Sequence, residues 1–307
     1  MDHLDHKFKT STKHDWRPEL KRLEGAYAPS TMKSYRVNVE IFVSWCELRQ
    51  FTAFPATEET IAGFLEDQSL TCSISTIKQR LYAIRKFHRL LVLEDATSSE
   101  EINLVLRRIR RRKSHRPNQA KALNQNHRDR FLSAQPDTPW GLRDKAIIAL
   151  GYDILARRSE LVALQTNDVV FREDGTARIT IRRSKSDQFG SGRVAFTSGE
   201  TATLLTDWLS WHSDASEYLF CPIHQYIPLD RGLNPSAIKR VIKKAAILAN
   251  FDQKDVAAFS GHSMRVGAAQ DLLCAGHETI AIMRAGGWKS TNVLARYLEY
   301  AEHNVWV

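Results

Sequence analysis

The sequence predicts a mainly α-helical protein with two domains, the second of which also carries a small antiparallel β-sheet. A length of 307 residues suggests about two domains, at roughly 100 to 200 residues each. Apolar residues recur at helical spacing along most of the chain, whereas the stretches 177–181 and 193–196 alternate like short strands. A basic stretch, 107–123, separates the two halves.

The first half predicts a small helical domain over residues 26–113, preceded by a loose arm at 1–25. The arm has mixed charge and few apolar residues. The second half of the basic stretch, 114–123, is interpreted as an interdomain linker. Helices are expected from Thr31 to Leu48, from an opening at 55–57, from Ser75 onward and from about Ser98 to Arg112.

The second half predicts an α-rich domain over residues 124–307. The two strands are joined by SKSDQFGSG, a typical turn composition. The segment DILARRSELVAL places two arginines in a helix that is otherwise apolar. Helices are expected at 142–155, 201–211 and 235–249, and from His262 to the end with breaks at Gly276 and at Gly286–Gly287.

Charge and cysteine usage narrow the function. The net charge of +9 and a pI of about 9.4 favour a polyanionic partner, either nucleic acid or an anionic membrane. The four cysteines form no CxxC pair, so neither a zinc site nor a disulfide framework is expected. The polar N-terminus is no secretory signal, and no apolar run is long enough to span a membrane. We therefore expect a cytoplasmic, nucleoid-associated protein whose default partner is nucleic acid.

Several residues suit phosphodiester transfer without a metal, although each has an ordinary structural explanation by itself. Arginine forks suit the non-bridging oxygens of a phosphate, tyrosine can attack phosphorus, and lysine or histidine can protonate the leaving oxygen. His262 and Arg265 lie three apart on one predicted helical face, a spacing typical of a surface pair. Lys185 in its turn is typical of a solvated lysine, and Trp288 and Tyr297 are typical of core aromatics.

In their order and spacing these residues resemble the tyrosine recombinase, or phage integrase, family. The family motif R-x-[SA]-E-[LI] matches RRSEL at 157–161, and H-x-x-R matches the string SGHSMRVGAA, which resembles the Cre-like members. A position that is His in most members and Trp in Cre-like ones matches the AGGW string. The matching catalytic positions are Arg157, Lys185, His262, Arg265, Trp288 and Tyr297, with Glu160 as active-site support.

The resemblance implies a C-shaped clamp around double-stranded DNA, made of a helical core-binding domain and a catalytic domain. It implies a 3′-phosphotyrosine intermediate, no metal or other cofactor, and a homotetramer that joins two inverted-repeat sites through a Holliday junction. It covers residues 124–307 strongly and the first half more weakly. Ten residues follow Tyr297, so a C-terminal helix that docks into a neighbouring subunit is in doubt; we expect Val305, Trp306 and Val307 to pack on a protein surface.

Candidate DNA contacts are less specific, because a solvated helix face explains each of them equally well. The basic run before the linker is expected to contact phosphates, and two helices are expected to reach DNA grooves. The candidates are Lys33, Thr76, Lys78, Gln79, Arg110, Arg111, Arg112, Ser236, Lys239 and Arg240. Two other functions remain open: a type IB topoisomerase with the same chemistry, and a DNA-binding protein of this fold without activity.

Overall fold

The structure is a computed structural model that describes residues 14–113, 119–182 and 192–302. The chain divides into two compact units, Met1–Pro117 and Asn118–Val307, and each contains a hydrophobic core. The division falls inside the stretch that the sequence assigns to a linker. Among the described residues, no helix is both long and apolar enough to cross a membrane.

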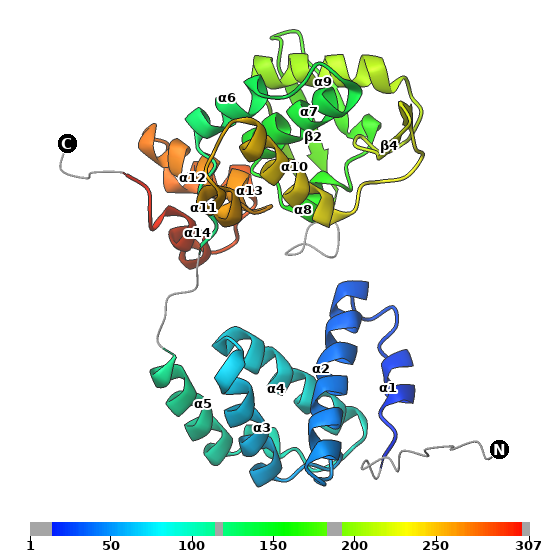
Figure 1. Ribbon diagram of the computed structural model, residues 1–307, viewed down its shortest axis with the longest axis vertical. Coiled ribbons are helices and arrows are strands. Elements are labelled where there is room, and N and C mark those ends of the chain that lie inside the picture. The colour runs from blue at the N-terminus through cyan, green and yellow to red at the C-terminus, as the bar shows by residue number, and fades with distance from the viewer. Residues whose placement is uncertain (1–13, 114–118, 183–191, 303–307) are drawn as a thin grey trace. The chain divides into compact units, whose positions relative to one another are not determined.

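The first unit is built from helices (Figure 1). Three of them begin after a Thr or Ser whose hydroxyl accepts a backbone N–H from the first turn, which satisfies a donor that the helix leaves unpaired. These caps, Thr57, Ser73 and Ser99, set the helix starts. The opening predicted at 55–57 ends on the observed cap, whereas the starts expected at Ser75 and about Ser98 lie one and two residues from the observed ones. The helices are α1 (Arg17–Lys21), α2 (Pro29–Leu48), α3 (Glu58–Thr71), α4 (Ile74–Leu90) and α5 (Glu100–Arg112), with a 3₁₀ turn at Ala96–Ser98.

Trp16 corrects the expectation of a loose arm that reaches residue 25. Its side chain is 2% exposed, and its ring meets the edge of Phe87 of α4 at a centroid distance of 5.6 Å. Leu23 is buried as well, and Leu20 packs against the same core. These three apolar residues anchor the described part of the segment, even though its other residues are mostly polar.

The second unit is α-rich with a small antiparallel sheet, as the sequence predicts (Figure 1). The strands β2 (Ala177–Ile181) and β3 (Arg193–Phe196) have the predicted bounds, and Ile181 lies opposite Arg193. A strand that the sequence analysis missed, β1 (Val169–Phe171), pairs with the other edge of β2. A second sheet pairs β4 (Ile223–His224) with β5 (Ile227–Pro228).

Helices make up most of the described part of this unit. The predicted breaks near Gly276 and Gly286–Gly287 separate the last three of them. The helices are α6 (Gln125–Ser133), α7 (Pro139–Asp153), α8 (Arg158–Leu161), α9 (Gly199–His212), α10 (Pro235–Leu248), α11 (Gln253–Ala258), α12 (Ser263–Cys274), α13 (Thr279–Gly286) and α14 (Thr291–Leu298).

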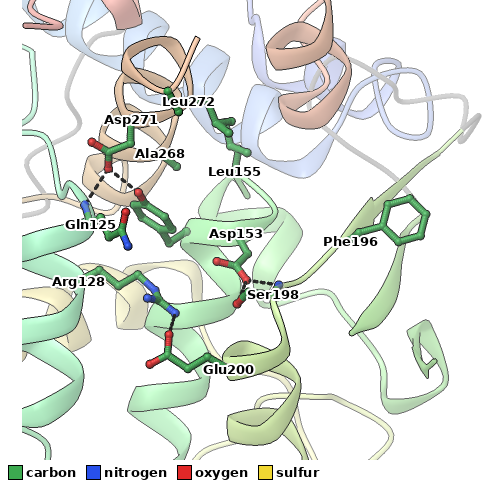
Figure 2. Close-up of a pocket in the computed structure, with 12 residues that line it drawn as sticks. Gln125, Arg128, Asp153, Leu155, Phe196, Ser198, Glu200, Ala268, Asp271 and Leu272 are labelled. Atoms are coloured by element: carbon green, nitrogen blue, oxygen red, sulfur yellow. Dashed lines mark hydrogen bonds and ion pairs between the residues drawn. The ribbon is translucent and has the colours of Figure 1, made fainter. Parts of the chain in front are cut away.

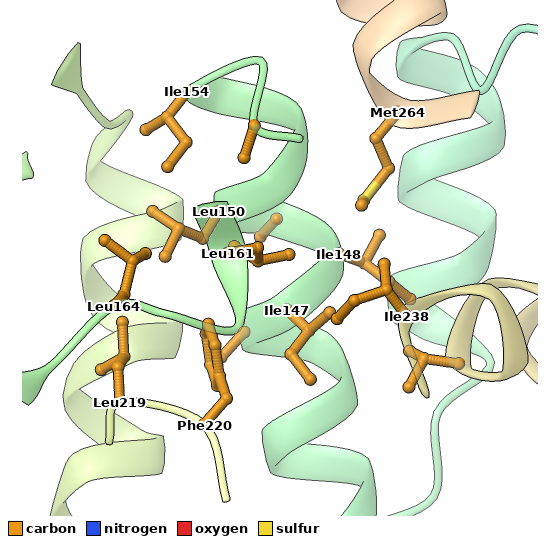
Figure 3. Close-up of a cluster of buried hydrophobic side chains, with 14 of the residues drawn as sticks. Ile147, Ile148, Leu150, Ile154, Leu161, Leu164, Leu219, Phe220, Ile238 and Met264 are labelled. Atoms are coloured by element: carbon orange, nitrogen blue, oxygen red, sulfur yellow. The ribbon is translucent and has the colours of Figure 1, made fainter. Parts of the chain in front are cut away.

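Helix α7 supplies the centre of the main core (Figure 3). Ile147 and Ile148 of α7 are fully buried, and Leu161 of α8 and Met264 of α12 reach the same core. Leu161 follows Glu160 directly and Met264 precedes Arg265 directly. Apolar packing onto α7 therefore fixes the backbone beside both arginine motifs.

The chain between α7 and α8 departs from the predicted continuous helix. Helix α7 ends at Asp153, Leu155 has a φ of +48°, and α8 begins only after Arg157. The two arginines of DILARRSELVAL therefore lie at the start of a new helix and not inside an apolar one. The break matters because it turns two backbone carbonyls toward the buried arginines described below.

The end of the predicted linker belongs to the second unit. Leu123 is fully buried, and its N–H donates to the carbonyl of Ser263 at 2.9 Å. A Cβ at Gly267 would lie 1.8 Å from the carbonyl oxygen of Leu123, so glycine at this position of α12 allows the close approach. The predicted linker, 114–123, is thus shorter at its C-terminal end, because one apolar side chain anchors it.

Candidate active site

Arg157 and Glu160 form a buried pair at the start of α8. The carboxylate of Glu160 accepts the backbone N–H of Arg157 at 3.0 Å and its Nη1 at 2.5 Å. The side chain of Glu160 is 1% exposed, whereas that of Arg157 is 18% exposed. The buried carboxylate holds in place a guanidinium that solvent, or a ligand, can still reach.

Arg265 is the most deeply buried arginine of the site. It is fully buried on α12, and its Nη1 donates to the carbonyl of Leu155. Its Nε and Nη2 are buried without a hydrogen-bond partner among the described residues. Buried charges are normally paired, because an unpaired one loses its hydration without compensation. The guanidinium therefore offers two N–H groups to an anion.

Trp288 and Tyr297 pack around this guanidinium. The Cζ of Arg265 lies 3.8 Å from the centroid of the Trp288 ring and 5.7 Å from that of Tyr297. The two rings meet at 5.1 Å with an interplanar angle of 67°. Cation–π attraction helps to keep the arginine charged at this depth. Three of the predicted catalytic residues, from α12, α14 and the segment after α13, thus form one cluster.

The electrostatics of the cluster favour an anionic ligand. Burial, and next to it repulsion from Arg157, lowers the pKa of Arg265 to about 10. The guanidinium remains protonated at neutral pH, but its charged form is less stable in this site than it would be in water. A bound phosphate would add negative charge to a cluster in which the carboxylate of Glu160 balances only part of the positive charge.

His262 and Lys185 remain less defined. His262 is the residue before α12, is exposed, and donates its backbone N–H to Oγ of Ser260 at 3.1 Å. It therefore precedes the helix instead of sharing a helical face with Arg265, as the sequence had suggested. Lys185 lies outside the described residues, as do Val305, Trp306 and Val307.

Two glutamines that sequence reasoning missed hold the helix of Tyr297. The Nε2 of Gln270 donates to the backbone carbonyl of Tyr297 at 2.9 Å, and Nε2 of Gln119 donates to the carbonyl of Arg296 at 3.0 Å. Another residue that was missed, Arg193, contacts Glu160 at 3.3 Å. Its position could have been inferred, because it shares a strand face with the buried Ala195.

The candidate DNA contacts lie on α2, α4 and α5 of the first unit and on α10 of the second. On the first unit, Gln79 of α4 donates to Oγ of Ser34 on α2 at 3.0 Å, which brings it close to the neighbouring Lys33. Thr76 is half-buried at the capped start of α4. The candidates that are exposed on α2, α4, the last turn of α5 and α10 are Lys33, Lys78, Gln79, Arg110, Arg111, Arg112, Ser236, Lys239 and Arg240.

A pocket of about 410 Å³ lies elsewhere in the second unit (Figure 2). Its polar walls are already paired: Arg128 donates to Glu200 at 2.6 Å, and Asp153 accepts the N–H of Ser198 at 2.7 Å. None of the described catalytic candidates lines it. The arginine cluster, and not this pocket, is therefore the candidate active site.

Comparison with known proteins identifies the family. Residues 115–303, more than half of the chain, match the model of the phage integrase family. The chain belongs to the phage integrase family. The resemblance inferred from the catalytic motifs is thereby confirmed, and the matched region contains every catalytic candidate.

Two relatives extend the likeness over most of the chain. Recombinase cre of Escherichia phage P1 is 29% identical over 294 residues, which cover 89% of this chain and 84% of the relative. An integrase/recombinase XerD homolog of Selenomonas ruminantium is 29% identical over 293 residues, covering 91% of this chain and 84% of the relative. The first unit therefore shares the likeness, although the family model matches mainly the second.

Solved structures support the fold class. The integrase of transposon Tn1549 in complex with circular intermediate DNA has a TM-score of 0.64 at 14% identity, and covers 94% of this chain and 96% of its own. A lambda integrase dimer bound to a core site has a TM-score of 0.63 at 13% identity, with the same coverage. The predicted mainly α fold of a helical domain followed by an α-rich domain with a small sheet is confirmed.

Proposed function

We propose that this protein is a site-specific recombinase that cleaves and rejoins DNA through a 3′-phosphotyrosine at Tyr297. The observation that carries the proposal is the cluster around Arg265, a buried cation whose Cζ lies 5.7 Å from the centroid of the Tyr297 ring and two of whose nitrogens have no partner in the described part of the chain. A phosphodiester would supply negative charge to these nitrogens. Tyrosine is the nucleophile next to it.

In the proposed reaction, Arg157 and Arg265 bind the non-bridging oxygens of the scissile phosphate. The Tyr297 oxygen forms a bond to phosphorus while the bond to the 5′-oxygen breaks, and Lys185 donates a proton to that leaving oxygen. The tyrosine proton passes to a base or to solvent. Glu160 supports Arg157, and His262 and Trp288 complete the surroundings of the phosphate. Preorganised positive charge of this kind is worth most where charge develops in the transition state.

The phosphotyrosine retains the energy of the phosphodiester bond, so the rejoining step needs neither ATP nor a metal ion. The 5′-hydroxyl of a partner strand attacks it and regenerates the tyrosine. Four subunits on two inverted-repeat sites of cellular DNA would exchange strands in this way through a Holliday junction. A lambda integrase solved as a tetramer on such a junction, with a TM-score of 0.62 to this chain, supports that arrangement by analogy.

Sequence readout is proposed for two helices. Thr76, Lys78 and Gln79 lie in the first turns of α4, where a helix that enters the major groove presents its side chains, and Lys33 of α2 lies beside them. Ser236, Lys239 and Arg240 lie in the first half of α10. Base contacts at these positions would choose the target sequence, whereas phosphate contacts elsewhere would not.

A plasmid assay separates this function from its alternatives. The target site is first selected from random DNA by binding, and two copies are then placed on one plasmid. A recombinase yields recombinant circles that depend on both sites. A type IB topoisomerase would relax a plasmid without exchange between sites, and an inactive DNA-binding protein would do neither.

We expect Lys185→Ala to slow cleavage by about 10²- to 10⁴-fold, the usual worth of general acid catalysis. The 5′-alkoxide is a poor leaving group, whereas a 5′-thiolate leaves without protonation. A substrate with sulfur at the bridging 5′ position should therefore restore most of the rate, measured in single-turnover cleavage. Arg157→Ala is the matched control, because an arginine on the non-bridging oxygens gains nothing from the sulfur. Rescue of both variants, or of neither, would make His262 the next candidate acid.

The last turn of α5 should contribute to the salt dependence of DNA binding. Each phosphate contact adds about −0.9 to the slope of log K against log salt, so neutralising Arg110 and Arg111 should flatten the slope by up to roughly 1.8. Arg112 should contribute less, because its guanidinium is shared with Glu66 of α3. Arg108→Gln is the control, since Arg108 pairs with Glu101 at 3.2 Å. An unchanged slope in the double variant would make this turn an ordinary solvated surface.

A further inference from the structure

Three segments of the second unit converge on Arg193, the first residue of β3. Its Nη2 donates to the carbonyl of Ile154 at 2.9 Å and lies 3.3 Å from Oε2 of Glu160, while Nη1 donates to the carbonyl of Ala285 at 2.5 Å. The side chain is 13% exposed. Because both terminal nitrogens already bond to the protein, Arg193 is arranged to hold its neighbours and not to bind a phosphate itself.

The contact of Arg193 with Glu160 concerns the support of Arg157. Oε1 of Glu160 accepts Nη1 of Arg157 at 2.5 Å, while Oε2 accepts both the backbone N–H of Arg157 and the Nη2 of Arg193. A carboxylate that is held on both oxygens cannot rotate freely. Arg193 therefore helps to fix the plane in which Glu160 presents its other oxygen to Arg157.

The second contact concerns the segment that carries Trp288. Ala285 lies in the last turn of α13, and Gly287 follows with a φ of +65°. A Cβ at Gly287 would lie 2.9 Å from Cδ of Arg193, so the side chain passes directly beneath this turn. Arg193 thus ties the backbone before Trp288 to the edge of the sheet.

The third contact links Arg193 to Arg265. The neighbouring carbonyls of Ile154 and Leu155, in the break between α7 and α8, accept hydrogen bonds from Arg193 and Arg265 respectively. One short turn therefore sets the places of two guanidiniums. Arg157 and Arg193 pair with the carboxylate of Glu160, whose charge also acts on Arg265, so three positive charges stand against one negative charge in the described cluster.

We propose that Arg193 is a positioning residue for phosphoryl transfer, acting on Arg157 through Glu160 and on Trp288 through Ala285. This role rests on the proposed function and extends that function to a residue that does not touch the phosphate. Its charge also adds to the excess positive field in which the non-bridging oxygens gain negative charge. Misplacement of a catalytic group by about 1 Å can cost roughly 10²-fold in rate, so the effect should be measurable.

The test compares single-turnover cleavage by Arg193→Gln and by Arg193→Lys on three DNA substrates. On the ordinary phosphodiester we expect Arg193→Gln to be about 10- to 100-fold slower, with half-site binding unchanged. Arg193→Lys should recover part of the rate because it keeps the charge. The recovery should be incomplete because a lysine cannot reach all three acceptors. On a methylphosphonate, which lacks the phosphate charge, the deficit of Arg193→Gln should shrink. On the 5′-sulfur substrate it should persist, since the leaving group is not what Arg193 affects.

Two controls separate positioning from damage to the fold. Arg128→Gln removes another buried, ion-paired arginine of the same unit, which should lower the melting temperature and leave the rate per folded molecule unchanged. Gly287 and Gly276 both have a positive φ, so alanine strains the backbone at either position. Gly287→Ala should slow cleavage because its Cβ would push on Arg193. Gly276→Ala should not, because nothing lies within 4 Å of a Cβ at that position.

A wild-type chain that forms no covalent DNA product would overturn the proposed function and this proposal together. If the wild type cleaves, three results would overturn the role of Arg193 alone. These are cleavage by Arg193→Gln at the wild-type rate, an equal deficit on all three substrates, and rescue by the 5′-sulfur. The expected pattern is a deficit that depends on the charge of the phosphate and not on its leaving group.

Discussion

Tyr297→Phe is expected to bind its DNA site with unchanged affinity and to form no covalent complex. The substitution removes the oxygen that attacks phosphorus and keeps the ring that packs 5.1 Å from Trp288. Covalent complex formation should therefore be lost completely, whereas the folding stability should hardly change. The measurement is a denaturing gel of protein trapped on a nicked DNA site whose cleaved strand cannot be rejoined.

Tyr300 provides the matched control. It is 54% exposed and lies beyond the end of α14, so Tyr300→Phe should trap DNA as the wild type does. A covalent complex that survives in Tyr297→Phe and disappears in Tyr300→Phe would show that the register of the nucleophile is wrong by one turn.

Arg265→Met should lower the cleavage rate by at least about 10²- to 10³-fold, the usual cost of removing one preorganised donor from a charge-stabilising site. The same variant should not be strongly destabilised when no DNA is bound. The folded-state pKa of Arg265, about 10, lies well below the ordinary value of an arginine. A cation whose pKa is lowered by folding costs stability at every pH below the folded pKa, and the cost is relieved only as pH rises above about 10.

At neutral pH this cost is fully present, because Arg265 is protonated in both the folded and the unfolded chain. Losing the bond to the Leu155 carbonyl and the stacking on Trp288 offsets part of the gain in Arg265→Met. We expect its melting temperature to lie within a few degrees of the wild type or above it, at roughly 2–4 °C per kcal/mol for domains of this size.

Arg128→Met is the contrasting variant in calorimetry. Arg128 is also buried, and although desolvation lowers its pKa, the hydrogen bond from its guanidinium to Glu200 raises the pKa overall. Its removal should clearly lower the melting temperature. Equal destabilisation by Arg265→Met and Arg128→Met would contradict the view that Arg265 serves to bind an anion and not to stabilise the fold.

Much of the fold follows from local patterns in the sequence. The bounds of β2 and β3 were predicted because alternation and a turn-forming loop define them together. Helix starts were less accurate, because the capping hydroxyls of Ser73 and Ser99 decide them and neighbouring serines give competing signals. The burial of Trp16 depends on Phe87, a partner far away in the sequence, which no local pattern reveals.

The candidate site likewise has parts that the sequence predicts and parts that depend on tertiary packing. Arg157, Arg265, Trp288 and Tyr297 were predicted from motif order, and the structure brings them together, while their roles remain proposals. The break at Leu155 was missed, since a run of Ile, Leu and Ala favours a continuous helix and only tertiary packing interrupts it. Arg193 was missed because its function depends on carbonyls from two other segments, and a carbonyl leaves no trace in the sequence.

The central claim is that Tyr297 becomes joined to the 3′ phosphate of the cleaved strand. The most direct measurement is to trap the wild-type protein on a nicked DNA site, digest both partners and identify the nucleotide-bearing peptide by mass spectrometry. The account predicts a single modified residue, Tyr297, joined through phosphate to the 3′ end of the DNA, with a free 5′-hydroxyl on the other side. Attachment at another residue, or to a 5′ end, would contradict it.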